Sequence, residues 1–158
     1  MKSVEQLRYL VLAAQREGNR TLARQLRPLG LTPSQAEVIR LVGAAGQLTI
    51  GGLGELLICE TGTNPSRLVN GLVSNGCLKK VSSNQDKRQI LVTLSAVGSV
   101  ANREIAKIES SLYDEIDKRL RDKDLVLVIE LLGGLVAGTP AGMAFKRRLS
   151  RPTGSDEV

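Results

Sequence analysis

The 158-residue sequence contains no histidine and no tryptophan, and it has only two cysteines, two tyrosines and one phenylalanine. Without histidine, the commonest acid–base group of enzymes is missing, and so is the imidazole ligand of many zinc sites. The aspartates and glutamates form no paired-carboxylate motif, and no glycine-rich phosphate loop follows an expected strand. We therefore expect no catalytic site, no bound metal and no cofactor.

Negative charge is also in short supply. The 22 lysines and arginines against 16 aspartates and glutamates give a net charge of +6 and an isoelectric point near 9.7. This balance favours an anionic partner such as nucleic acid. The length suits one domain, or one protomer of an intertwined assembly.

Long hydrophobic runs are lacking as well. The N-terminus has one lysine followed by mixed charge, without the continuous apolar segment of a secretory signal. The longest apolar run, residues 125–137, is interrupted by Glu130 and is too short to cross a bilayer. We therefore expect a cytoplasmic protein with no membrane segment.

Helix-start signals divide the first part of the chain. Ser3 and Gln6 are spaced as a capping box, and Thr32 followed by Pro33 combines an N-cap with proline at the first helical position. Thr49 can cap a further short helix, although neighbouring glycines weaken it. These signals predict helices over residues 3–24, 33–45 and 49–57, and a very short strand at Leu48.

The stretch 61–94 predicts a helix followed by a β-hairpin. Thr63 or Asn64 can cap the helix, Pro65 fits its first position, and Gly76 ends it. The helix has one apolar face and one polar face, and side chains of the polar types found there can bind base edges and phosphates. The polar face consists of Thr63, Ser66, Arg67 and Asn70. A solvated helix face has much the same composition.

The hairpin should cover residues 77–94. Its second strand alternates apolar and polar residues, so one face of the strand should be buried. The alternating apolar residues are Ile90, Val92 and Leu94. The polar loop 82–88 can carry Lys87 and Arg88 beyond the body of the domain. This order of elements predicts a winged helix-turn-helix, mainly α with a small β-hairpin wing.

Two further helices are expected after the hairpin. Ser95 can cap a long helix to about residue 121, and Asp122 or Asp124 can cap a second helix through Val136. The second helix is apolar nearly all round and needs several partners, so the terminal helices should form the interface of an interlocked homodimer. A monomeric helical cap over the winged helix is the alternative. The residues assigned to dimerisation are Leu7, Val11, Leu112, Ile116, Leu125, Ile129 and Leu132.

The chain thus divides into three regions. The end of the last region, residues 147–158, is polar and short, so we expect it to contribute little to the fold. The regions are a helical dimerisation region at residues 1–32 and 96–140, a winged helix-turn-helix domain at residues 33–95, and a basic, flexible tail at residues 141–158.

Several segments resemble the MarR family of winged-helix transcription regulators. The resemblance rests on LTPSQAEVIRLV, LTIGGLGELL, PSRLVNGLVSNGCLKK and DKRQILVTLSAVG, and it covers residues 31–98 at motif level. It implies a two-fold dimer that presents two winged-helix lobes to successive major grooves of double-stranded DNA and represses nearby genes.

The resemblance also implies particular DNA contacts. Gly62 departs from the cation or hydroxyl that the family often has at its position, so it offers only its backbone to DNA. Asn70 and Lys87 join the candidate site through the polar helix face and the loop tip. Carried over by motif, the family's contacts fall on Thr61, Gly62, Thr63, Asn64, Ser66 and Arg67 of the recognition helix and on Asp86 and Arg88 of the wing.

The two cysteines have a redox interpretation and an inert one. Cys77 has Lys79 and Lys80 nearby, which favours a reactive thiolate, whereas a strand position favours a buried and inert thiol, which we prefer. Cys59 stands where the family commonly has glycine. A Cys59–Cys77 disulfide is disfavoured, because the two residues flank opposite ends of the expected helix, roughly 15–20 Å apart.

A DNA-binding regulator is the function that these features favour. Arg67, Arg88 and the positive net charge distinguish it from a winged-helix protein-interaction adaptor without DNA binding, and the absence of histidine argues against an enzyme. Relatives often bind a small-molecule effector between the winged helix and the dimer helices, but this chain has few aromatic residues to line such a cleft. Arg8, Arg16 and Arg40 are interpreted as solvated charges.

Overall fold

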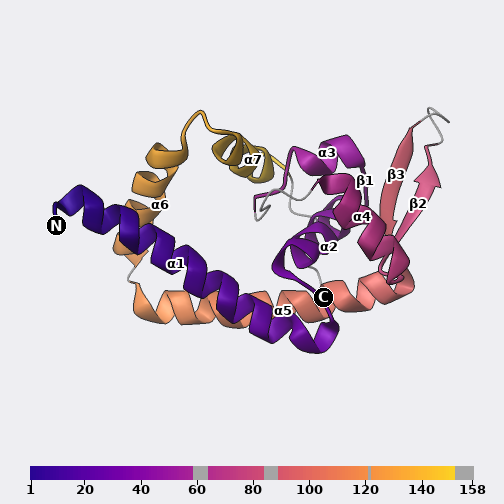
Figure 1. Cartoon of the computed structure of the whole chain (residues 1–158), viewed down its shortest axis with the longest axis horizontal. Coiled ribbons are helices and arrows are strands. Elements are labelled where there is room, and N and C mark those ends of the chain that lie inside the picture. Colours follow the sequence, from indigo (N-terminus) through magenta and orange to yellow (C-terminus); the bar gives the residue numbers. More distant parts are fainter. Residues whose placement is uncertain (59–63, 84–88, 121, 152–158) are drawn as a thin grey trace.

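The structure, a computed structural model, describes residues 1–58, 64–83, 89–120 and 122–151. Helices make up most of it, and one small antiparallel sheet completes the fold (Figure 1), which confirms the predicted fold class. The elements are α1 (Ser3–Leu26), the 3-10 helix η1 (Arg27–Leu29), α2 (Pro33–Ala45), β1 (Gln47–Thr49), α3 (Ile50–Gly54), α4 (Pro65–Ser74), β2 (Leu78–Ser82), β3 (Ile90–Leu94), α5 (Ala96–Arg119), α6 (Asp122–Val136) and α7 (Pro140–Leu149).

Helix α1 is capped one residue earlier than predicted. The backbone N–H of Lys2 donates to Glu5 Oε2 over 2.8 Å, and Lys2 occupies the N-cap position. The assignment of the cap to Ser3 is therefore wrong, because the glutamate at the third helical position reaches back to Lys2. At the other end, Gly30 closes η1 in the left-handed region (φ 66°), which turns the chain into α2.

Polar caps begin the helices of the winged-helix region. Gln35 N–H donates to Thr32 Oγ1 over 3.3 Å, and Thr32 N–H donates to Gln35 Oε1 over 2.9 Å, which is the predicted capping box. The side chains of Thr49 and Asn64 accept backbone N–H groups at the starts of α3 and α4. These bonds satisfy donors that have no partner inside the helix.

The sheet has three antiparallel strands in the order β1-β3-β2. Val92 at the centre of β3 pairs with Leu48 on one side and with Lys80 on the other, and it is fully buried. Ile90, in contrast, is 50% exposed, so the prediction that it belongs to the buried face is wrong. The reason is its place in the outer half of the hairpin, which projects beyond the helices (Figure 1).

Helix α2 lies at the centre of the core. It contacts α1, α3, α4, α5, β1 and β3, and its Val38, Ile39 and Val42 are fully buried. Leu72 of α4 and Val92 of β3 are equally buried in the same cluster. The core therefore holds α4 and the hairpin against one helix, which fixes the direction in which the other face of α4 points.

The start of α5 packs closely on the base of the hairpin. Ser95 Oγ accepts the N–H of Gly98 over 2.9 Å and donates to the carbonyl oxygen of Gly76. A Cβ added to Gly98 would lie 1.9 Å from the carbonyl oxygen of Cys77. Glycine is required here because no side chain fits between α5 and that carbonyl group.

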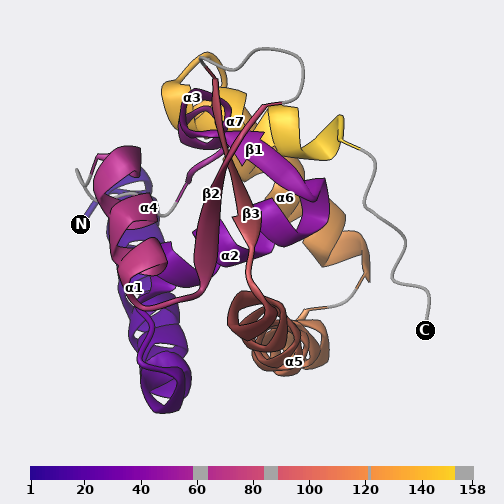
Figure 2. The same cartoon turned by 90° about the vertical axis from the view of Figure 1, so that its right-hand side faces the viewer.

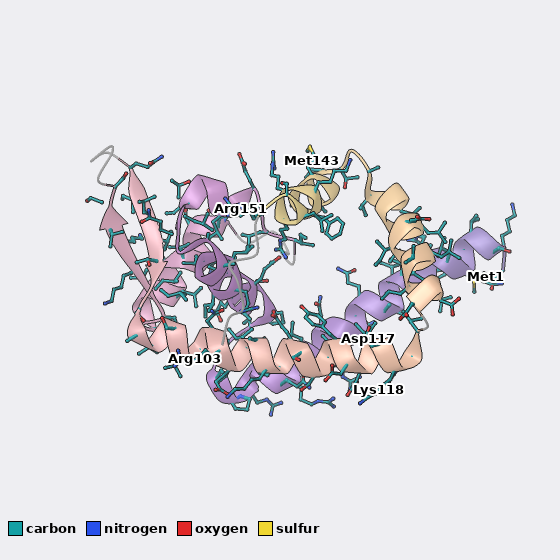
Figure 3. All side chains as sticks on the ribbon, turned by 180° about the vertical axis from the view of Figure 1, so that it is seen from behind. Met1, Arg103, Asp117, Lys118, Met143 and Arg151 are labelled. Atoms are coloured by element: carbon teal, nitrogen blue, oxygen red, sulfur yellow. The ribbon has the colours of Figure 1, made fainter. Side chains whose placement is uncertain are left out.

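Helix α6 and the first half of α1 extend away from the winged helix, and Met1 marks the far end of α1 (Figures 1 and 3). Together, α1, α5 and α6 form what we call the arm. Many large apolar side chains of the arm are exposed in the single chain. None of the helices described is both long enough and apolar enough to cross a membrane.

Helix α7 returns from the end of α6 to the winged-helix side and lies beside α3 (Figures 1 and 2). Thr139 Oγ1 accepts the N–H of Gly142, and Pro140 occupies the first helical turn. The prediction of a flexible tail over residues 141–158 is therefore wrong up to Leu149. The sequence has the same threonine–proline start signal here as at α2, whereas the polar, basic composition of the last residues gives no indication of a helix.

Candidate nucleic-acid interface

The two faces of α4 differ in burial. Leu68, Val69 and Leu72 are buried, and the helix contacts α2 and α3. The opposite face is open to solvent, so its polar groups are available to a partner. Of the contacts predicted on this helix, Asn64, Arg67 and Asn70 are exposed and Ser66 is half-buried.

Other residues of the predicted site lie outside the described residues. Their proposed contacts with DNA, and the redox interpretation of one of them, stay predictions. They are Thr61, Gly62 and Thr63 ahead of α4, Asp86, Lys87 and Arg88 in the wing, and Cys59.

A hydrogen bond joins the wing to the exposed face of α4. Lys80 Nζ of β2 donates to Asn70 Oδ1 over 2.7 Å. The bond places a cation next to the polar face and ties one side chain of that face in position. Lys80 is not among the predicted contacts, although the two adjacent lysines at the start of the hairpin are a signal for a cation there.

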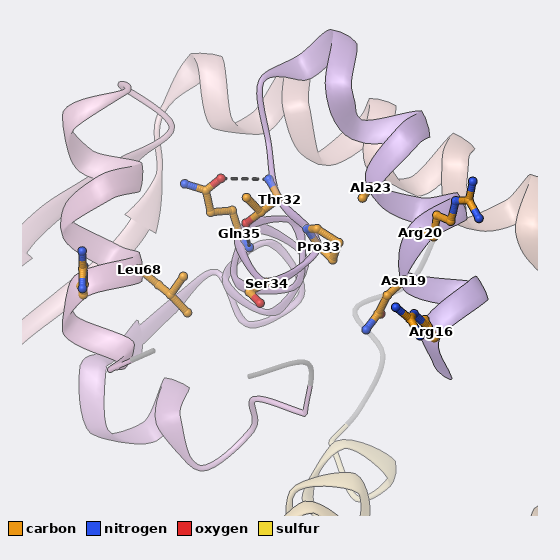
Figure 4. A pocket seen from close by; sticks show the side chains of 10 residues that line it. Arg16, Asn19, Arg20, Ala23, Thr32, Pro33, Ser34, Gln35 and Leu68 are labelled. Carbon is orange, nitrogen blue, oxygen red and sulfur yellow. Dashed lines mark hydrogen bonds between the residues drawn. The ribbon is translucent and has the colours of Figure 1, made fainter. Parts of the chain in front are cut away.

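A groove of about 660 Å³ lies between α1, α2 and α4 (Figure 4). Arg16, Asn19 and Arg20 line it from α1, and Arg67 lines it from α4. Glu17 lies 3.8 Å from the Arg20 guanidinium and is exposed, so it offsets little of this charge. The edge of α4 that faces α1 is therefore positively charged.

A second cavity, of about 670 Å³, is lined by residues of α1, α2, β1, α5 and α7. Part of its wall is apolar, with Leu22, Leu41 and Leu112 among the lining residues. Arg40 Nε pairs with Glu109 Oε2 over 2.8 Å, and its Nη1 donates to Asn102 Oδ1 over 3.0 Å. The interpretation of Arg40 as a solvated charge is therefore wrong.

Tyr113 is the aromatic residue of this cavity. Burial raises the pKa of its phenol, and the Glu109 carboxylate raises it further, whereas Arg40 and Arg148 act in the opposite direction. The phenol therefore stays neutral at physiological pH and can donate a hydrogen bond into the cavity.

Cys77 lies at the base of the hairpin, where its side chain is buried and its thiol is free. Burial raises the pKa of the thiol, which lowers the fraction of reactive thiolate. Both observations favour the inert interpretation. Within the described ranges, no group of three or more cysteine, aspartate or glutamate side chains is placed to hold a metal ion.

The residues assigned to dimerisation remain accessible in the single chain. Leu7, Ile129 and Leu132 are 48%, 53% and 41% exposed, respectively. None of the assigned residues belongs to the hydrophobic core. The whole set is Leu7, Val11, Leu112, Ile116, Leu125, Ile129 and Leu132, of which Leu112 and Leu125 are half-buried and the others are exposed.

No family model and no curated relative matches the sequence. Solved structures do match it. The reduced form of MarR from E. coli is 25% identical with a TM-score of 0.66, covering 82% of this chain and 96% of that one. A mutant of E. coli MarR complexed with operator DNA is also 25% identical, with a TM-score of 0.73 over 84% of this chain and 95% of that one.

A probable transcriptional regulator from Pseudomonas aeruginosa has the same fold, with a TM-score of 0.72 at 20% identity, covering 85% of this chain and 99% of that one. These matches span most of each chain and therefore include the arm as well as the winged helix. They agree with the motifs in the sequence and with the observed order of helices and hairpin. The chain accordingly has the winged helix-turn-helix fold of MarR-family transcriptional regulators and is similar to them over most of its length.

Proposed function

We propose that the chain is a homodimeric, sequence-specific DNA-binding regulator that represses nearby genes. The observation that carries the proposal is the exposed polar face of α4, where Asn64, Arg67 and Asn70 stand clear of the core. An α-helix fits the major groove, and amide and guanidinium groups match the hydrogen-bonding edges of its bases. The likeness to E. coli MarR complexed with operator DNA supports the same kind of partner.

Pairing of two chains through the arm is the second part of the proposal. The large apolar side chains exposed on α1 and α6 support it, because burying such surface releases about 25 cal/mol per Å². A two-fold dimer presents two α4 helices, so the operator should be a pseudo-palindrome with half-site centres about 10 base pairs apart. A protein that acts on chromosomal DNA also fits the cytoplasmic location predicted from the sequence.

Control by a small molecule is the third part. The cavity beside α2 and α5 combines apolar side chains and the neutral phenol of Tyr113 with Arg40 and Arg148, so an acidic and partly apolar compound could bind there by competing with Glu109 and Glu37 for the two guanidinium groups. It adjoins both the winged helix and the arm, so a bound compound could favour one arrangement of the two. Benzoate is a simple probe, and it should raise Tm in the wild type but not in Arg40→Ala; no rise in the wild type would argue against aromatic acids.

A fluorescence anisotropy titration tests the DNA-binding proposal. A duplex from the DNA upstream of the gene that encodes this chain is compared with a scrambled duplex at about 50 and 200 mM salt, because phosphate contacts weaken steeply over this range. The proposal expects tighter binding to the upstream duplex. Absence of binding to either duplex at low salt would refute it and would favour the protein-binding adaptor.

A further inference from the structure

Helix α7 contacts the turn that precedes α4 in the chain. Arg148 Nε donates to the carbonyl oxygen of Leu56 over 2.8 Å, and Arg147 Nη1 donates to the carbonyl oxygen of Glu55 over 3.3 Å. Arg147 also pairs with the Glu55 carboxylate over 3.7 Å. The C-terminal helix thus holds backbone that is distant from it in sequence, as its place beside α3 in Figure 2 illustrates.

A buried carboxylate connects these contacts to the core. Glu37 Oε1 of α2 forms an ion pair with the Arg148 guanidinium and accepts the backbone N–H of Ile58 over 2.8 Å. The Glu37 side chain is 7% exposed, and a carboxylate so far removed from water requires charged and hydrogen-bonding partners. Arg148 and the Ile58 backbone therefore meet on one oxygen atom.

The turn has one side in the core and one side at the surface. Leu56 and Leu57 are buried, whereas the side chain of Ile58 is exposed. The bond from Ile58 N–H to Glu37 therefore fixes the end of the turn that the core does not hold. Any displacement of Ile58 moves the chain at the point from which it continues toward the N-cap of α4 at Asn64.

The orientation of α7 is set by its crossing with α6. A Cβ added to Gly142 would lie 2.0 Å from the carbonyl oxygen of Val136, so the two helices touch backbone to backbone. Ala144 in the next turn of α7 is buried. A helix fixed to the arm at its start therefore contacts the winged helix through Arg148 near its end.

We propose that Arg148 and Glu37 are positioning residues for operator recognition. Their ion pair makes α7 a strut, by which we mean a helix that connects the arm to the turn before α4 and so fixes the orientation of α4 relative to the arm. The inference rests on the proposed function, because it assigns the strut a role in binding DNA. Arg148 also lines the cavity beside α2 and α5, so an acidic compound bound there would compete with Glu37 for the same guanidinium.

Amide hydrogen exchange tests the contact directly. The Ile58 N–H is bonded to Glu37, so the peptide that contains residues 55–58 should lose protection in Arg148→Ala and in Glu37→Gln. Lys146→Ala removes an exposed cation from the same helix and should leave this peptide unchanged. Arg148→Lys keeps the charge and should restore part of the protection.

DNA titrations test the effect of the contact on recognition. Affinity for a duplex selected by the wild type should fall about 2- to 30-fold in Arg148→Ala, the range expected when a coupling contact is lost. Affinity for a scrambled duplex should fall no more than in Lys146→Ala, which loses the same charge. If Arg148→Ala does not fold, Glu37→Gln, which has almost the same shape, carries both measurements.

Each outcome separates the strut from the DNA-binding proposal. Unchanged exchange over residues 55–58 in Arg148→Ala would overturn the strut, whatever the chain binds. Equal losses on the selected and scrambled duplexes would overturn the positioning role. A wild type that binds no DNA would refute the proposed function and the positioning role with it, while faster exchange in Arg148→Ala would still establish the contact.

Discussion

Replacing Gly98 by alanine should lower the free energy of unfolding by about 1–3 kcal/mol. The added Cβ would lie 1.9 Å from the Cys77 carbonyl oxygen, so the two atoms must separate by about 1 Å to reach the closest tolerated distance. The same carbonyl accepts the Ser95 N–H over 3.0 Å, and weakening that bond adds about 1 kcal/mol. The higher helix propensity of alanine offsets at most about 1 kcal/mol of this cost, so the net effect of the substitution is destabilising.

Urea unfolding followed by circular dichroism measures this difference, at one chain concentration because the proposed dimer would add to stability. Gly18→Ala is the matched control. A Cβ on Gly18 meets no atom within 4 Å, so the substitution should stabilise α1 by up to about 1 kcal/mol. A steric conflict at Gly98 is excluded if Gly98→Ala is as stable as the wild type at an unchanged m-value, or if the two glycine substitutions change stability alike.

Three further predictions concern the interface, the dimer and the thiol. Arg67→Ala should cost about 1–3 kcal/mol of binding free energy on the cognate duplex and much less on scrambled DNA, whereas Arg88→Ala should weaken binding to both duplexes and reduce the slope of log affinity against log salt concentration by about two per dimer. Anisotropy over a salt series measures both effects, and equal losses on the two duplexes for Arg67→Ala would mean that Arg67 only positions α4. Leu132→Asp should give a folded monomer by light scattering, since this side chain lies outside the core, and an unchanged dimer would exclude α6 from the interface. Burial raises the pKa of Cys77, so the thiol keeps its proton to higher pH in the folded chain than in the unfolded chain. Alkylation of Cys77 should therefore be slow at neutral pH, and the free energy of unfolding should fall as pH rises above about 8.5, an effect that Cys77→Ala should remove.

Local chemistry explains which parts of the fold could be predicted from the sequence. The caps at Thr32, Asn64 and Ser95 depend on a side chain and a backbone N–H within three residues, so they are visible in the sequence and are confirmed by the structure. The error at Ser3 shows the limit of such signals, because Glu5 and Gln6 offer competing partners one residue apart. Periodicity also predicts the apolar face of α4, because a single core covers that face at Leu68, Val69 and Leu72.

Long-range contacts explain what could not be predicted. Arg40 meets Glu109 across 69 positions, and Arg148 meets Glu37 across 111, so neither pair has a signature in local sequence. The arginine lining of the groove beside α4 appears only when α1 is placed next to it. Ile90 was misplaced because alternation identifies the faces of a strand but not how far the core extends along it.

The bond between Lys80 and Asn70 has a consequence for the base that Asn70 can select. A free asparagine can read adenine through its oxygen and its amino group together, but here Lys80 Nζ occupies Oδ1 at 2.7 Å. Oδ1 keeps one lone pair for a base, beside the two N–H donors of the amino group. In the proposed complex with DNA, the bond from Lys80 therefore favours donation from the Asn70 amino group to acceptors such as guanine O6 and N7 or thymine O4, and the two-bond contact with adenine strengthens where Lys80 turns away to a phosphate.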